Sequence, residues 1–415
     1  MNRKNETFDT VLGNRVTACG DLEAGEGGQG IAKLAQWSGR PGEQFVLKVF
    51  GSDLDPKATR ERTDFLIRKS LDKRSPLFCT PVDRISDHSV VGHVAPFADG
   101  LPLNDFLQKA PRSLMQTHCA AIAIAQGLDL LDKEGMSYGD IKPGNVLLGE
   151  HGSAILVFFI DLDNFGAKGV APPPSYGDPH YAAPEIVRRM KEGRPGVPDK
   201  YADRFSLGVL LHVLLLFVHP SEGNDMSEDR YSKAMWEGKW LLDPYAGSLP
   251  PYRAGRPPAV LNASLAEAIR GGMSLERADR TSAEKWLKTL LRTSHEITLC
   301  PDCGRAMYFD PTRRICPYDN RLFSSLSVVL PNGVRIPVES NHVVLGRDLL
   351  KSPHVSAPHV VLRKLGNETS LETMGRYGTW KLVKGVWEPL KPGVQTEIAA
   401  GMKFKLADVE IGVEK

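Results

Sequence analysis

The chain has 415 residues, with 52 lysines and arginines against 50 aspartates and glutamates and a formal net charge of +2. This balance gives the chain no overall field toward nucleic acid or a membrane surface, so recognition must depend on local groups. A chain longer than about 300 residues usually forms more than one hydrophobic core, and we expect about two or three domains. The longest apolar run, 205–218, is shorter than the roughly 20 residues of a bilayer helix. The N-terminus shows no leader pattern, so a cytoplasmic protein is predicted.

Residues 10–97 carry the pattern of a small sheet with one helix. Strand-like segments cover 45–50 and 90–94, and a charged helical stretch covers 56–71. A glycine-rich turn comes first, at Gly25, Gly27, Gly28 and Gly30. Glycines between two strands let backbone N–H groups approach phosphate oxygens. Lys48 lies in the apolar strand that follows, where it either reaches the same phosphates or extends from the strand edge to water.

Helical patterns dominate from about 102 to 293, for example over 114–133, and they are interrupted by polar residues at strand ends. Asp140, Lys142 and Asn145 form a tight polar loop directly before an apolar segment. Asp161 follows the apolar run 158–160, at the spacing of a β-hairpin. Its carboxylate is a suitable ligand for a divalent ion that bridges phosphates.

Together, these motifs resemble the Ser/Thr type of the protein kinase superfamily over about residues 15–293. The resemblance implies an α+β bilobal kinase domain over 10–293, with an N-lobe at about 10–97 and a C-lobe at about 98–293. It also implies ATP and Mg²⁺ or Mn²⁺ as cofactors and proteins as substrates. A bacterial-type kinase is predicted.

The resemblance assigns a role to each polar residue. Lys48 would pair with the α- and β-phosphates, and the glycines would cover the phosphates. Asp140 would accept or orient the substrate hydroxyl, and Lys142 would neutralise the γ-phosphate. Mg²⁺ would be held by Asn145 and Asp161. The helix over 56–71 would supply a carboxylate partner for Lys48, with Glu61 preferred and Asp64 as the alternative; an exposed face charge is the other interpretation of Glu61.

Further landmarks follow the kinase order. Ala183-Pro184-Glu185 occupies the end of the activation segment, Asp203 begins the long apolar helix, and Arg280 would pair with Glu185. Three positions depart from the family pattern, namely Tyr138-Gly139 before Asp140, Asp163 after Asp161-Leu162, and Asp178 in place of a threonine. We expect Asp178 to attract Lys142 or to raise a neighbouring pKa and so to lower activity. The alternatives to an active protein kinase are a nucleotide-binding pseudokinase scaffold and transfer to a small molecule.

Residues 294–323 contain two short knuckle-like pairs. Cys300 and Cys303 form the first pair, and Cys316 and Asp319 form the second. This spacing is typical of a zinc ribbon, with an aspartate in place of the fourth cysteine. His295 is an alternative fourth ligand, and a metal-free hairpin with reduced thiols is the alternative structure. We expect structural Zn²⁺, because so short a segment cannot bury a core by itself.

Residues 324–415 contain short valine-rich strands separated by turns. Three motifs resemble those of a forkhead-associated (FHA) domain: Val344-Leu345-Gly346-Arg347, Ser356-Ala357-Pro358-His359 and Gly375-Arg376-Tyr377-Gly378-Thr379. The resemblance implies an all-β sandwich that binds phosphothreonine peptides through Arg347 and Ser356, with His359 supporting the loop. Ala357 and Tyr377 depart from the usual residues, so a docking module without phosphate recognition is the alternative. Phosphothreonine partners, including the chain itself, are thus predicted, and nucleic acid and membranes are not.

Overall fold

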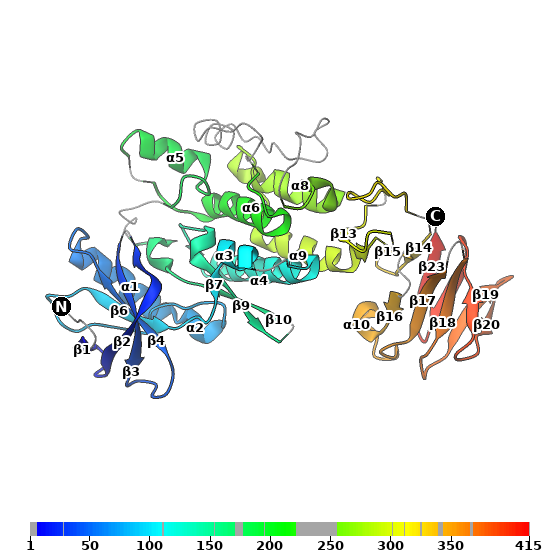
Figure 1. Ribbon diagram of the computed structural model, residues 1–415, viewed down its shortest axis with the longest axis horizontal. Helices are drawn as coiled ribbons and strands as arrows, with labels where there is room; N and C mark the ends of the chain where they lie inside the picture. Colours follow the sequence, from blue (N-terminus) through cyan, green and yellow to red (C-terminus); the bar gives the residue numbers. More distant parts are fainter. Residues whose placement is uncertain are drawn as a thin grey trace. The chain divides into compact units, whose positions relative to one another are not determined.

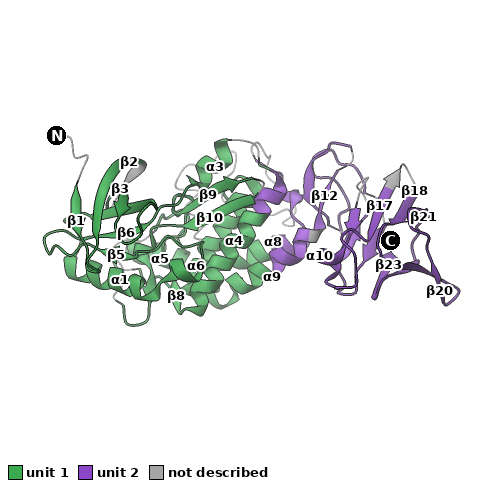
Figure 2. Ribbon diagram, turned by 90° about the horizontal axis from the view of Figure 1, so that it is seen from below, with its two compact units in different colours: residues 1–112, 119–242, 268–287 green, residues 113–118, 243–267, 288–415 purple. Residues whose placement is uncertain are grey.

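The computed structural model describes residues 6–27, 29–109, 112–152, 154–170, 177–194, 196–220, 255–300, 302–310, 312–323, 326–338, 343–365 and 368–414. The chain divides into two compact units. The first comprises 1–112, 119–242 and 268–287, and the second comprises 113–118, 243–267 and 288–415; they are green and purple in Figure 2.

The first unit begins with a six-stranded antiparallel sheet in the order β1-β2-β3-β4-β6-β5. Its strands are β1 (Thr7–Asp9), β2 (Arg15–Gly27), β3 (Gly30–Trp37), β4 (Phe45–Phe50), β5 (Asp83–Arg84) and β6 (Gly92–Pro96). Side chains alternate between the faces of a strand, so β4 buries Phe45 and Leu47 and carries Lys48 on its other face. Ala32 and His93 flank Lys48 on the neighbouring strands.

One helix accompanies this sheet, α1 (Pro56–Lys69), with the short α2 (Leu71–Arg74) after it (Figure 1). The Asp55 side chain caps the start of α1 by accepting a hydrogen bond from Lys57 N at 2.9 Å. Ser70 ends the helix in the left-handed conformation. The predicted sheet and helix of the N-terminal region are therefore present.

Helices form most of the remainder of the first unit. Its described helices include α3 (Leu103–Lys109), α5 (Pro184–Lys191) and α6 (Lys200–Leu216), and α4 (Leu114–Lys133), α8 (Ala263–Gly272) and α9 (Ala283–Thr293) lie partly in it. Nearly every residue of α6 is buried, which is why its sequence is apolar on all faces. Within the part of the chain that the structure describes, no helix is both long and apolar enough to span a bilayer.

A β-hairpin brings the polar segments of the first unit together. Its strands β9 (Val146–His151) and β10 (Ala154–Phe159) pair in register, as the sequence spacing predicted. A third strand, β7 (Leu101–Pro102), pairs with β9, and β8 (Met136–Ser137) pairs with β11 (Gly166–Ala167) in a separate two-stranded sheet. Turns of 3-10 helix precede β9 (η1, Pro143–Asn145) and follow β10 (η2, Leu162–Asn164), so both lie at the open end of the hairpin, opposite its turn.

The second unit contains short helical turns, a small hairpin and a β-sandwich. The turns are η3 (Pro258–Val260) and η5 (Ser294–Glu296), whereas η4 (Arg277–Asp279) belongs to the first unit. The hairpin pairs β12 (Ile297–Leu299) with β13 (Ala306–Tyr308). Tyr308 is buried, and its hydroxyl lies 2.8 Å from His118 Nδ1.

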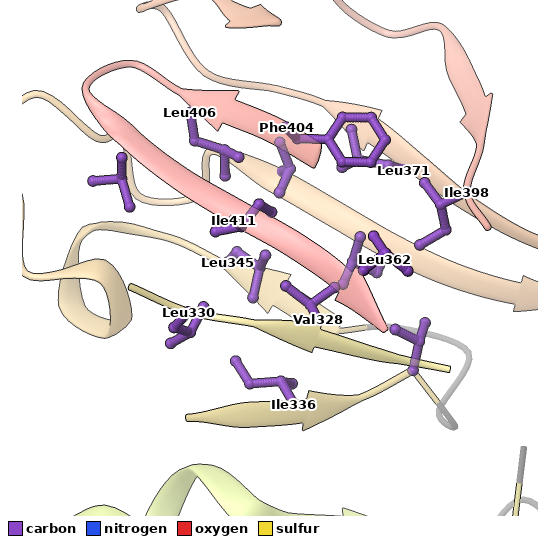
Figure 3. Close-up of a cluster of buried hydrophobic side chains, with 14 of the residues drawn as sticks. Val328, Leu330, Ile336, Leu345, Leu362, Leu371, Ile398, Phe404, Leu406 and Ile411 are labelled. Atoms are coloured by element: carbon purple, nitrogen blue, oxygen red, sulfur yellow. The ribbon is translucent and has the colours of Figure 1, made fainter. Parts of the chain in front are cut away.

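The sandwich consists of two antiparallel sheets, in the orders β15-β14-β23-β22-β19-β20 and β16-β17-β18-β21. A short helix, α10 (Arg347–Leu350), follows β16. Figure 3 shows apolar side chains of both sheets pointing toward one another, among them Val328, Leu362 and Phe404. This core is consistent with the predicted all-β module. The strands are β14 (Ser327–Val329), β15 (Arg335–Pro337), β16 (Val343–Leu345), β17 (Val360–Leu365), β18 (Glu368–Thr373), β19 (Thr379–Val383), β20 (Val386–Pro389), β21 (Gln395–Glu397), β22 (Lys403–Leu406) and β23 (Val409–Glu414).

Candidate functional site

Asp140 is a buried residue of the first unit that several side chains hold in place. It is 5% exposed, and its Oδ2 accepts hydrogen bonds from Lys142 Nζ at 2.9 Å, Asn145 Nδ2 at 3.0 Å and Asn164 Nδ2 at 3.4 Å. Its other oxygen, Oδ1, is buried and has no partner among the described residues. A Cβ at Gly177 would lie 2.6 Å from that oxygen. Glycine at 177 therefore keeps the space beside Oδ1 open, in a pocket also lined by Asp178.

The backbone before Asp140 is held by the buried carboxylate of Asp203. Asp203 Oδ1 accepts a hydrogen bond from Gly139 N at 3.0 Å, and its Oδ2 accepts one from Tyr138 N. Burial raises the pKa of Asp203 to about 7. Tyr138 is also buried, and its hydroxyl donates to the carbonyls of Asn145 and Ile160. Tyr138 and Asp203 thus fix the loop that presents Asp140.

Lys48 lies between two carboxylates. Its Nζ contacts Asp161 Oδ1 and lies 2.6 Å from Asp163 Oδ2. Burial lowers the pKa of Lys48, but the charges of Asp163 and Asp161 outweigh burial and raise it overall, so the amine stays protonated. Burial raises the pKa of Asp161, and the nearby Asp163 adds to this shift. Asp161 has a φ of 58°, a left-handed conformation that costs energy in a non-glycine residue.

The donor set around Asp161 suits a divalent cation. The Asn145 side chain makes both of its described hydrogen bonds through Nδ2, which leaves its amide oxygen as the group to offer a metal. Carboxylate and amide oxygens are the ligands that Mg²⁺ prefers. The geometry therefore fits the predicted pair of Asn145 and Asp161.

The predicted helix partner of Lys48 is not formed. Glu61 is exposed, and Asp64 forms an ion pair with Arg84 at 2.6 Å. The helix position that faces the site belongs to Arg62, which is 7% exposed. Successive residues of a helix point about 100° apart, so Glu61, one residue earlier, points away. The carboxylates that contact Lys48 are instead those of Asp161 and Asp163.

Arg62 instead binds the segment that follows Asp161. Its guanidinium donates to the carbonyl of Asp163, at 3.0 Å from Nε and 2.8 Å from Nη2, and to that of Phe165. It also lies over the Phe165 ring, 4.3 Å from the centroid. Burial lowers the pKa of Arg62 to about 10, which leaves it charged at neutral pH. Sequence reasoning gave no site role to Arg62, Asp163 or Asn164, which the structure places in the site. Of these three, Asp163 alone was noticed, as the carboxylate after Asp161-Leu162.

The glycine-rich turn is only partly described. Gly25 and Gly27 belong to β2, Gly30 begins β3, and Gly28 lies outside the described residues. A Cβ at Gly30 would lie 2.2 Å from Val49 O, so this position requires glycine. Gln29 Nε2 donates to Asn164 Oδ1 at 2.9 Å. This contact links the turn to the loop around Asp140.

Asp178 does not attract Lys142 as predicted. Its Oδ1 accepts a hydrogen bond from His180 N at 2.9 Å and lies 2.9 Å from His180 Nδ1, whereas Lys142 binds Asp140. The local turn between residues 178 and 180 gives Asp178 a nearer partner than the lysine. The predicted pair of Arg280 and Glu185 is present, with nitrogen–oxygen distances of 2.7 and 2.8 Å.

The cysteine segment of the second unit forms two similar turns. Gly304 N donates to Cys300 O and Cys300 N to Arg305 O, at 2.8 and 2.9 Å. The second turn repeats this pattern among Cys316, Asn320 and Arg321, at 3.0 and 2.8 Å. Gly304 and Asn320 both have left-handed backbones. Asp319 therefore occupies in the second turn the position that Cys303 occupies in the first.

The four predicted zinc ligands meet at one point. The sulfur atoms of Cys300, Cys303 and Cys316 and a carboxylate oxygen of Asp319 all lie within 4.8 Å of one another. The sulfur atoms of Cys303 and Cys316 are 3.8 Å apart, which is the separation expected for two thiolates each about 2.3 Å from a tetrahedral zinc. The side chain of His295, the alternative ligand, lies outside the described residues.

Helix α10 and the loop before β17 bring the predicted phosphopeptide residues together. Arg347 is exposed, and its Nε donates to Val355 O at 3.0 Å while its backbone N donates to Ser356 O at 3.0 Å. Ser356 Oγ accepts a hydrogen bond from Arg376 N at 3.0 Å. His359 is fully buried and accepts a hydrogen bond from Ser356 N at 3.1 Å. The arrangement places a guanidinium and a hydroxyl on one loop surface.

The lobe architecture and the cluster around Asp140 and Lys48 are those of a phosphoryl-transfer enzyme of the kinase class. The protein kinase domain family matches residues 23–290. Because this match covers more than half of the chain, the chain belongs to the protein kinase family.

Individual relatives agree with this family. The chain is 34% identical to serine/threonine-protein kinase mrck-1 of Caenorhabditis elegans over 134 residues, or 32% of this chain and 8% of that protein. It is 34% identical to serine/threonine-protein kinase TAO2 of Homo sapiens over 110 residues, 26% of this chain and 8% of that protein. It is 29% identical to protein kinase C eta type of Mus musculus over 249 residues, 56% of this chain and 34% of that protein. All three relatives are protein kinases by name, two of them serine/threonine-protein kinases, and the chain spans 8% to 34% of their length.

Proposed function

We propose that the chain transfers the γ-phosphoryl group of ATP to serine or threonine hydroxyls of protein substrates. The observation that carries the proposal is the state of Asp140. One of its oxygens is held by Lys142, Asn145 and Asn164, and the other faces a pocket beside Gly177 without a described partner. A carboxylate fixed through one oxygen and free at the other is suited to accept the proton of a hydroxyl.

In this reaction the substrate oxygen forms a bond to the γ-phosphorus, the bond between that phosphorus and the bridging oxygen of ADP breaks, and the hydroxyl proton passes to Asp140 Oδ1. Lys142 is 2.9 Å from Asp140 and would place positive charge beside the transferred group. Lys48 would hold the α- and β-phosphates. Mg²⁺ bound through Asn145 and Asp161 would neutralise phosphate charge.

The rival function is a pseudokinase scaffold that binds nucleotide and recruits partners. Both functions predict nucleotide binding, so the test is transfer itself. Purified chain and its Asp140→Asn variant are incubated with γ-labelled ATP, Mg²⁺ or Mn²⁺ and a generic basic protein, and label is mapped by residue type. Label on serine or threonine that disappears in the variant supports the kinase. Nucleotide binding without transfer supports the scaffold. The pair of Asp178 and His180 would then be the first candidate for the cause of the lost activity. The predicted bacterial type and cytoplasmic location stay predictions.

A structural zinc site at Cys300, Cys303, Cys316 and Asp319 is part of the proposal. Its support is the repeated turn geometry and the convergence of four ligand atoms within 4.8 Å. Three thiolates and one carboxylate form a closed four-ligand set, which leaves no open position for catalysis. The ion would stabilise the short hairpin segment through its binding free energy.

A phosphothreonine-reading function of the C-terminal sandwich, as in an FHA domain, completes the proposal. The support is the position of the exposed Arg347 beside Ser356, whose loop is held from within by the buried His359. A guanidinium and a hydroxyl together suit a phosphate dianion. Writing and reading of phosphothreonine would then be coupled in one signalling chain, through a partner phosphoprotein or the chain itself.

A further inference from the structure

The carboxylates that hold Lys48 both come from one short segment. Asp161 and Asp163 stand at the two ends of the turn Asp161-Leu162-Asp163, and the Lys48 ammonium contacts both. Asp163 is the more buried of the two, with 12% of its side chain exposed against 34% for Asp161. The strand carrying Lys48 therefore depends on this segment for its charge partner.

Helix α1 contributes no carboxylate to this cluster. The helix faces the segment with Arg62, a cation that would repel Lys48 if no anion lay nearby. Arg62 fixes the segment by its backbone, through the carbonyls of Asp163 and Phe165. Phe65 of α1 stacks on Phe165, with ring centroids 5.1 Å apart and planes 16° from parallel. The helix thus orients Asp163, and Asp163, not a residue of the helix, forms the ion pair with Lys48.

The two carboxylates have different roles once nucleotide is bound: one ligates the metal ion and the other holds Lys48. Asp161, with its left-handed backbone and partial exposure, is the proposed metal ligand. A carboxylate that ligates Mg²⁺ gives up charge to the ion, so it holds a lysine less firmly. Asp163 is then the anion that keeps the Lys48 ammonium in place.

We propose that Asp163 is the positioning residue for Lys48, in the role expected of Glu61, and that helix α1 acts on the nucleotide site through the contacts of Arg62 and Phe65 with residues 163–165 and not through a carboxylate. The proposal rests on the proposed use of ATP. It does not require that the chain transfer phosphate.

The test is a double-mutant cycle on nucleotide binding. The full chain, Asp163→Asn, Glu61→Gln, Lys48→Met and the Lys48→Met/Asp163→Asn double variant are titrated with a fluorescent ATP analogue at several Mg²⁺ concentrations. Circular dichroism melting verifies that each variant folds. Both carboxylate-to-amide changes keep the side-chain shape, so Glu61→Gln is the matched comparison for Asp163→Asn.

We expect Asp163→Asn to weaken nucleotide binding about tenfold, because coupling between contacting charges is typically of that size. Glu61→Gln is expected to change binding less than about twofold, as an exposed surface charge does. In the Lys48→Met background, Asp163→Asn is expected to have no further effect at any Mg²⁺ concentration, because its partner is gone.

Other outcomes overturn the inference. If Glu61→Gln reduces nucleotide affinity as much as Asp163→Asn does, the residue that positions Lys48 lies on helix α1. A loss from Asp163→Asn that persists without Lys48, and that added Mg²⁺ reverses, would make Asp163 a metal ligand. If Asp163→Asn leaves nucleotide affinity unchanged, Asp163 does not position Lys48. A wild-type chain that binds nucleotide and transfers no label contradicts the proposed function alone, because the binding comparison remains decisive.

Discussion

Arg280 and Glu185 form a two-pronged ion pair, with Nη1–Oε1 at 2.7 Å and Nη2–Oε2 at 2.8 Å. The Arg280 side chain is completely buried and also donates to the carbonyls of Ser274 and Tyr201. This pair ties helix α5, at the end of the segment that follows Asp161, to the region before α9. The Arg280 side chain thus holds together two segments that lie far apart in the sequence, around residues 185 and 280.

Arg280→Ala should destabilise the kinase domain by about 3 kcal/mol or more, because it leaves two carbonyls without their buried donor and Glu185 with the longer contact to Arg277, at 3.4 Å. Chemical denaturation measures the change. The control is Arg194→Ala, whose exposed guanidinium pairs with Glu192 and should contribute below about 1 kcal/mol. Equal losses in the two variants would contradict the assignment of Arg280 as the main tie.

Asp140→Asn should reduce phosphoryl transfer at least about 100-fold while nucleotide affinity changes little, because the amide oxygen cannot accept the hydroxyl proton. The measurement pairs initial rates of label transfer with direct nucleotide titration. Asp105→Asn, on the exposed face of α3, is the matched control. Substantial residual transfer in Asp140→Asn would remove Asp140 from the chemical step.

His212 should make stability depend on pH. Burial lowers its pKa to about 3, although a hydrogen bond to Val218 O opposes the shift, whereas an unfolded histidine titrates near ~6.5. Between these values the unfolded chain binds the additional proton, so stability is complete above about pH 6.5 and is lost as the pH falls.

His212→Gln should remove this dependence. The stability advantage of the wild type over His212→Gln should shrink by about 1.4 kcal/mol per pH unit below about pH 6, as measured by denaturation at a series of pH values. The control is His88→Gln, at an exposed position. An advantage that stays constant from pH 7 to about pH 4 would show that His212 is not neutral in the folded chain.

The zinc proposal predicts about one zinc per chain by elemental analysis. Asp319→Ala should lose zinc and lower the melting temperature of the second unit, whereas Asp319→Cys should keep zinc and bind it more tightly because it completes a four-thiolate set. Cys119→Ser, at an exposed free cysteine, is the control. A zinc content that none of these variants changes would place the metal elsewhere.

The phosphothreonine proposal predicts that Arg347→Ala weakens binding of a phosphothreonine peptide about tenfold or more, because a charge-assisted contact to the phosphate is lost. Fluorescence anisotropy with phosphorylated and unphosphorylated peptide measures this effect. Arg335→Ala removes a cation that pairs with Glu414 on the sandwich and is the matched control. If the wild type does not discriminate between the two peptides, the sandwich is a docking module without phosphate recognition.

The sequence by itself determined the parts of this protein whose signals are local. Hydrophobic periodicity placed the helices at 56–71 and 114–133, the β-hairpin before Asp161 and the C-terminal strands. Motif spacing selected Lys48, Asp140, Asn145 and Asp161, because short-range order along the chain determines which of them share a loop or strand end. The knuckle spacing in the same way selected the four side chains that cluster at 300–319.

Only the tertiary structure decided which charges meet across the fold. Lys48 and Asp163 are 115 residues apart, and Arg62 and Phe165 are 103 apart, so no local pattern links them. A one-residue difference in helix phase turned Glu61 outward and Arg62 inward, which reversed the sign of the charge that α1 presents to the site. The side chain of Asp178 pairs with His180 within a turn of three residues, whereas the departure from the family pattern had suggested a pair with Lys142. These outcomes depend on packing, because the energy of a charge pair is set by distance and burial that exist only after the chain has folded.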